Sequence, residues 1–111
     1  MTQVTSETEV FKQPGESKLY SMDFTDLLGT SETISSVTSV TEEGTTDLTI
    51  ANKVVITSET VVDGVTIGVN KGISFRVSGG IHGRNYRIEA IVVTSAANTL
   101  EGDGILKVRD C

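Results

Sequence analysis

The residues that could carry chemistry are few, and the first to consider is the only histidine, His82. It lies in a glycine-rich stretch, residues 79–85, with no cysteine or acidic residue close by. A zinc site usually needs roughly three or four nitrogen or sulfur ligands. Nucleophilic catalysis needs a hydroxyl or thiol beside a base and an orienting group, and scattered serines with one histidine do not supply it. We expect His82 to be a turn residue and the protein not to be an enzyme.

Two glycine-containing stretches could hold an ion or an anion. Residues 101–104 read EGDG, and the carboxylates of Glu101 and Asp103 could bind Ca²⁺. Calcium takes about six to eight oxygen ligands, so two carboxylates fall short and a solvated loop is the expectation. Residues 79–83 could suggest a phosphate cradle. Such a loop precedes a helix, whereas a strand pattern follows here.

The only cysteine, Cys111, is the last residue of the sequence. One cysteine excludes an intramolecular disulfide, and with it a disulfide-framed secreted scaffold. A terminal thiol can be incidental, or it could form an intermolecular disulfide, because a chain end is free to reach a neighbour. Non-reducing gel electrophoresis of the native assembly separates these interpretations, since only the second gives a covalent dimer.

Composition and charge bound the protein class. The chain has 111 residues, which suits one domain, with 37% hydrophobic and 5% aromatic residues. Its net charge is −6, which argues against binding nucleic acid or anionic lipid, because phosphate contacts need clustered Lys and Arg. The first residues, MTQVTSETEV, lack the features of a signal peptide, so we expect synthesis in a reducing cytosol.

The clearest structural pattern spans residues 73–94. Two runs alternate apolar and polar residues, which is typical of half-buried strands. The apolar face of the first run holds Ile73, Phe75 and Val77, and that of the second Tyr86, Ile88, Ala90 and Val92. A tyrosine that opens a strand after a glycine-rich corner is typical of immunoglobulin-like sandwiches.

Shorter strands are predicted on both sides of this pair. They cover residues 10–13, 18–24, 33–41, 48–50, 54–57 and 105–108, with a helical turn at 25–29 and a hairpin at 61–67. Residues 95–104 are predicted to form a long polar loop. The pattern predicts an all-β protein, an immunoglobulin-like antiparallel β-sandwich of seven to eight short strands. We expect a flexible arm at residues 1–9 and a single domain at 10–111.

Four segments carry a family resemblance: FKQPGESKLYSMDFTDLL (11–28), SETISSVTSV (31–40), ISFRVSGGIHGRNYRIEAIVVTS (73–95) and ILKVRD (105–110). In these segments the chain resembles a family of small structural proteins encoded among the virion genes of tailed bacteriophages. The resemblance implies an immunoglobulin-like sandwich that serves as a non-enzymatic virion component, at the capsid surface, neck or tail. It implies no catalytic residues and no cofactor.

The leading functional hypothesis is a capsid decoration or cement protein. It would be made in the host cytoplasm, bind the major capsid protein or other virion proteins, and form a homo-oligomer, for which a trimer would suit a capsid three-fold site. The alternatives are a neck, tail or fibre-associated virion protein, or a carbohydrate- or protein-binding adhesion module. The arm and the loop at 95–104 are the expected contact surfaces, with Met1, Val4, Val10, Asn98 and Leu100 as contact residues. No nucleic acid or membrane partner is expected.

Overall fold

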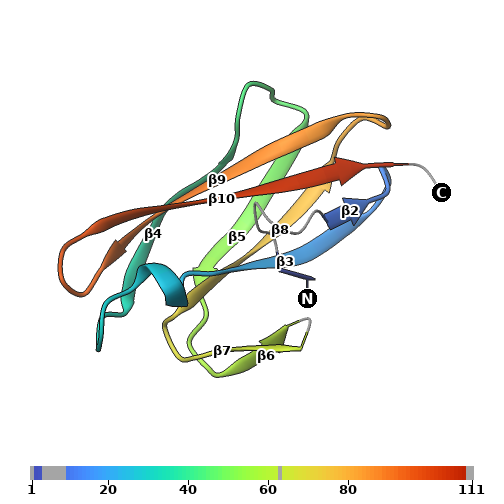
Figure 1. Ribbon diagram of the computed structural model, residues 1–111. Coiled ribbons are helices and arrows are strands. Elements are labelled where there is room, and N and C mark those ends of the chain that lie inside the picture. The colour runs from blue at the N-terminus through green and yellow to red at the C-terminus, as the bar shows by residue number, and fades with distance from the viewer. Residues whose placement is uncertain (1, 4–9, 63, 110–111) are drawn as a thin grey trace.

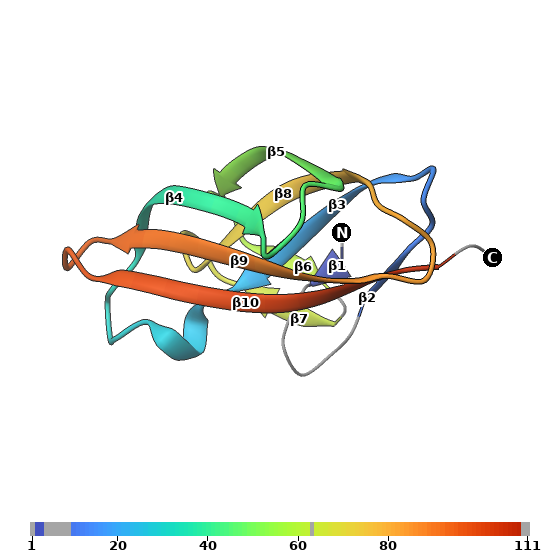
Figure 2. The same ribbon diagram turned by 90° about the horizontal axis from the view of Figure 1, so that it is seen from above.

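Two four-stranded sheets pack face to face and enclose the core (Figure 1). The computed structural model describes residues 2–3, 10–62 and 64–109. Sheet A has the order β1 (Thr2–Gln3), β3 (Ser17–Asp23), β8 (Gly72–Gly79), β5 (Leu48–Val55). Sheet B has the order β2 (Val10–Lys12), β10 (Thr99–Val108), β9 (Asn85–Thr94), β4 (Ile34–Glu42). The view from above, in Figure 2, shows β9 and β10 running side by side along the molecule.

The strand order is that of an immunoglobulin sandwich, which confirms the predicted fold class. Strands β1, β3, β8 and β5 take the places of A, B, E and D, and β4, β9 and β10 take those of C, F and G. A separate hairpin, β6 (Thr60–Val62) with β7 (Val65–Ile67), precedes β8 and has a small core of its own with Ile56. One 3-10 turn, η1 (Thr25–Leu27), follows β3 as predicted.

The core follows the alternation of the strands. All seven apolar residues predicted to face inward from the pattern at 73–94 are buried. Tyr20 of β3 pairs with Phe75 of β8, and their ring centroids lie 6.4 Å apart. Burying one such side chain stabilises the fold by roughly 1.5–3 kcal/mol, so these alternating rows account for much of the stability.

The predicted loop at residues 95–104 is wrong. The chain turns within residues 95–98 and already enters β10 at Thr99. Glycine made this segment look like a loop, but Gly102 is needed inside the sandwich: a Cβ there would lie 2.7 Å from Met22 Sδ and 2.9 Å from Phe24 Cζ. Glu101 and Asp103, on either side of Gly102, point outward from the sheet.

Two further expectations need correction. The two short strands predicted at 48–50 and 54–57 are one strand, β5 (Leu48–Val55), with a bulge between Ala51 and Val54, where Asn52 takes a φ of 54°. The sandwich is also not purely antiparallel: β2 pairs with β10 in parallel, and β1 with β3 likewise. The turn after β2 carries the chain from sheet B into sheet A, which leaves β2 beside the last strand and in the same direction.

Part of the predicted N-terminal arm is a strand, because Thr2–Gln3 pair with Tyr20 and Ser21 of β3. Met1, residues 4–9 and Cys111 lie outside the described residues, as do the predictions made for them. No helix in the described part of the chain is long and apolar enough to span a bilayer.

Candidate functional site

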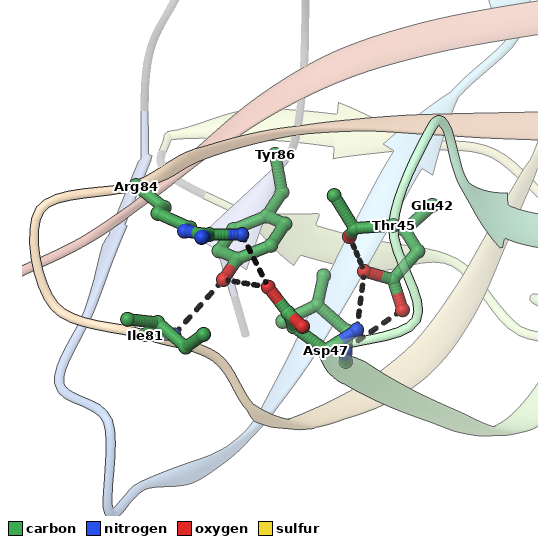
Figure 3. Close-up of polar contacts among 7 residues, drawn as sticks. Glu42, Thr45, Asp47, Ile81, Arg84 and Tyr86 are labelled. Carbon is green, nitrogen blue, oxygen red and sulfur yellow. Dashed lines mark hydrogen bonds and ion pairs between the residues drawn. The ribbon is translucent and has the colours of Figure 1, made fainter.

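One end of the sandwich is braced by the phenol of Tyr86 (Figure 3). Its hydroxyl accepts a hydrogen bond from the backbone N–H of Ile81 at 2.9 Å and donates one to Asp47 Oδ2, also at 2.9 Å. Arg84 donates to the same Asp47 oxygen at 3.2 Å. The contact with Ile81, five residues upstream, has the character of a tyrosine corner. It ties the β8–β9 crossover to the β4–β5 loop.

Glu42 holds the other side of the β4–β5 loop. Its carboxylate accepts hydrogen bonds from the N–H groups of Asp47 at 3.1 Å and Leu48 at 2.7 Å, and from the Thr45 hydroxyl. A carboxylate that accepts several bonds fixes the loop backbone more firmly than neutral acceptors would. We call the surface formed by residues 43–47 and 80–84 the Tyr86 end.

Tyr86→Phe is expected to lower the free energy of unfolding by about 1–3 kcal/mol, because it leaves the Ile81 N–H and the Asp47 carboxylate each short of a partner beside a buried ring. Tyr20→Phe is the matched control, since among the described residues the Tyr20 hydroxyl makes one long contact, 3.4 Å to the Phe11 carbonyl. Denaturant unfolding of both variants checks the difference. Equal losses would contradict a bracing role for the Tyr86 hydroxyl.

The opposite end is braced by Glu32, which lies between β3 and β4. Its carboxylate accepts hydrogen bonds from the Gly29 N–H at 2.8 Å, from Asn98 Nδ2 at 2.9 Å and from the Thr94 hydroxyl. The bond from the Gly29 N–H, followed by those from Thr94 and Asn98, lowers the pKa of Glu32. We call the surface formed by residues 25–33, 68–71 and 95–98 the Glu32 end.

Each end displays apolar surface beside its braced loops. Ile81 at the Tyr86 end is 47% exposed, and Leu27 at the Glu32 end is 54% exposed. Tyr86 and Thr94 stand at the two ends of β9, so about 27 Å separates the two ends. Exposed apolar residues on rigid loops suit protein contacts better than catalysis.

Residues 101–104, considered as an ion site and expected to be a solvated loop, lie in β10, and their carboxylates belong to an acidic group on the outside of sheet B. Glu101 and Asp103 of β10 lie beside Glu89 of β9, and carboxylate oxygens of the three fall within 4.8 Å of one another. The hydrogen bond with Glu101, and then its charge, raise the pKa of Glu89. Arg87 pairs with Asp103 at 3.1 Å and with Glu43 at 3.3 Å. Sequence spacing gave no sign of Glu89, which joins the group only through strand register.

The remaining predicted site residues lie in different parts of the fold and form no common site among the described residues. His82 lies in a turn on the surface, as predicted. Val10 is only 5% exposed, so its side chain belongs to the core and offers no contact surface. Asn98 is exposed at the Glu32 end, and Leu100 of β10 is half-buried against the core. Met1, Val4 and Cys111 fall outside the described residues.

Comparison with known families gives one match, and it spans residues 12–107. The matching family is described as podophage GP4 fiber-tail adaptor protein gp77. Neither the curated proteins nor the solved structures give a significant match. The family confirms a phage virion structural protein, and it fits the tail- or fibre-associated alternative better than capsid decoration. With its sandwich matched almost from end to end, the chain belongs to the podophage fiber-tail adaptor family gp77.

Proposed function

We propose that this protein is a non-enzymatic connector that joins fibre to tail in the virion, with one end of the sandwich for each partner. The observation that carries the proposal is the family match over residues 12–107, which includes both braced ends. The family description names an adaptor between these two structures, and an adaptor needs two separate contact surfaces.

The geometry supports a rigid spacer. The Tyr86 end and the Glu32 end are each held by a carboxylate that accepts hydrogen bonds from loop backbone, so neither loop has to order on binding. Preformed surfaces avoid the entropy cost of ordering, which leaves more of the contact energy for affinity. The exposed side chains of Ile81 and Leu27 are the apolar anchors expected at these two contacts.

The test is a phage that lacks this protein, compared with intact particles by electron microscopy and quantitative mass spectrometry. We expect particles with a complete capsid and no attached fibres. In intact particles, we expect the copy number to follow that of the fibre protein. A copy number close to that of the major capsid protein, with fibres still attached in the deletion, would overturn the connector role and restore capsid decoration.

Single substitutions at the two ends then separate the two contacts. Ile81→Ser should weaken binding to one partner and Leu27→Ser binding to the other, each lowering affinity by about tenfold or more, as expected for an apolar anchor. Val54→Ser, on the exposed edge strand β5, is the control and should leave both contacts unchanged. Pull-down with tails and with purified fibres measures each contact. Loss of the same partner in both end variants would contradict a two-ended connector.

A further inference from the structure

The outer face of sheet B carries opposite charges at its two ends. Along β10 the inward positions are Gly102, Gly104, Leu106 and Val108, and the residue before each of them points outward. In order, these are Glu101, Asp103, Ile105 and Lys107. The outward side of one strand therefore changes from acidic, through apolar, to basic.

The basic end is built around an exposed aromatic ring. Phe11 of β2 is 57% exposed and lies beside Lys107 in the ladder, with Lys107 Nζ 6.0 Å from the ring centroid. Next to the ring is a surface hollow of about 260 Å³, whose lining includes Glu16 and Lys18 at the edge of sheet A as well as Arg109. The Arg109 guanidinium donates to the backbone carbonyls of Arg84 and Val108 and to the Asn85 amide oxygen. We call Phe11, Lys107 and Arg109, which share the outer face of sheet B, the basic patch.

The acidic end is the group of Glu89, Glu101 and Asp103, which we call the acidic patch. Arg87 supplies one positive charge there, against these three carboxylates and Glu43. Like charges held this close repel each other. The hydrogen bond with Glu101, and after it the charge of Glu101, raise the pKa of Glu89. Cations brought by a binding partner would relieve the repulsion.

We propose that the outer face of sheet B binds a second copy of this chain, with the basic patch of one copy against the acidic patch of the other. The two patches are complementary in charge, and four residues of β10, about 13 Å, separate Asp103 from Lys107. The protein as a whole is acidic, so a concentrated basic patch marks a place where a negatively charged surface can approach. This contact goes beyond the connector function and does not depend on it.

The size of the face is consistent with a contact between two copies. The strands of sheet B have 3, 10, 10 and 9 residues, and at roughly 3.3 Å per residue and 4.8 Å per strand they cover about 500 Å² per copy and about 1,000 Å² in total. That is the lower limit for a specific interface, so we expect association that depends on concentration and salt. Phe11 supplies the aromatic contact that such interfaces favour.

The test is sedimentation velocity of the full chain under reducing conditions, so that Cys111 cannot cross-link copies. We expect association at low ionic strength that is lost at about 1 M salt, where the screening length falls to roughly 3 Å. Lys107→Glu/Arg109→Glu and Glu89→Lys/Glu101→Lys should each raise the dissociation constant about tenfold or more, because each places like charges against each other. Mixing the two variants should restore association, since one then has two acidic patches and the other two basic patches.

The matched control is Lys53→Glu/Arg76→Glu, which makes the same charge change on exposed positions of sheet A and should associate like the unmodified chain. Circular dichroism verifies that all variants are folded. An unmodified chain that stays monomeric at all concentrations would overturn the proposal, as would two singly reversed variants that fail to associate when mixed. If the chain is monomeric but binds tail or fibre through this face, the proposed contact between two copies is overturned. The connector role then still stands, with this face as one of its contact surfaces.

Discussion

Gly79→Ala is expected to lower the free energy of unfolding by about 3 kcal/mol, through left-handed backbone strain and overpacking together. Gly79 ends β8 with a φ of +84°, and a Cβ added there would lie 2.7 Å from the backbone oxygen of Asp47. Backbone cannot move aside as a flexible side chain can. The displaced residue is also the one that binds the Tyr86 hydroxyl, so the brace at that end should weaken with the fold.

Gly83→Ala separates the two causes. Gly83 lies in the same crossover with a φ of +89°, but a Cβ added there would meet nothing within 4 Å. Only backbone strain remains at this position, and we expect a loss of about 1 kcal/mol. Chemical denaturation of both variants is the measurement, with hydrogen exchange at the Ile81 amide as the local readout. Equal losses would show that close approach to Asp47 contributes nothing.

Alkaline pH is expected to destabilise the protein between pH 10 and pH 12. Burial, and then the charge of Glu16, raise the pKa of Tyr20 to about 12 from 10.0. The folded state thus keeps a proton that the unfolded state releases, so this stabilisation is complete below pH 10 and is lost as the pH rises through 12. Two pH units correspond to about 2.7 kcal/mol.

Tyr20→Phe should remove most of this alkaline sensitivity while keeping the buried ring. Tyr86, whose pKa is also raised chiefly by burial, contributes in the same direction, and Lys12, whose pKa burial lowers, contributes in the opposite one. The contributions of Tyr86 and Lys12 are the same in the unmodified protein and in the variant. They therefore cancel when the two free energies of unfolding are subtracted. Denaturant unfolding across the alkaline range gives that difference, and tyrosinate absorbance follows the ionisation because the chain has two tyrosines and no tryptophan. An unchanged pH dependence in the variant would contradict the assignment to Tyr20.

The alternating strands were predictable because burial alone dictates them. Tyr86 and the residues that follow it show period-two alternation in the sequence, and the structure buries them as that period requires. The segment around Gly102 was not predictable in the same way. Glycine signals a loop locally, and its reason for standing in β10 is the bulk of Met22 and Phe24, about 80 residues away in the chain.

The polar contacts were harder still to predict. A tyrosine corner at Tyr86 was expected, but its bond to Asp47 joins residues 39 positions apart that no periodicity relates. The acidic patch likewise depends on the register of β9 with β10, which brings Glu89 opposite Asp103. Sequence alone indicates which residues prefer the interior, whereas the partners of individual polar groups follow from the topology.

The parallel pairing of β2 with β10 has a mechanical consequence for a structural protein of the virion. Val10, Phe11 and Lys12 pair with Leu106, Lys107 and Val108, and the Arg109 N–H donates to the Lys12 carbonyl at 2.9 Å. Tension applied ahead of Val10 and beyond Arg109 pulls two parallel strands lengthwise in opposite directions. The hydrogen bonds between them then carry the load together, in shear, instead of opening one after another as in a peeled hairpin. A pull applied between these two points therefore meets its resistance at the seam between β2 and β10.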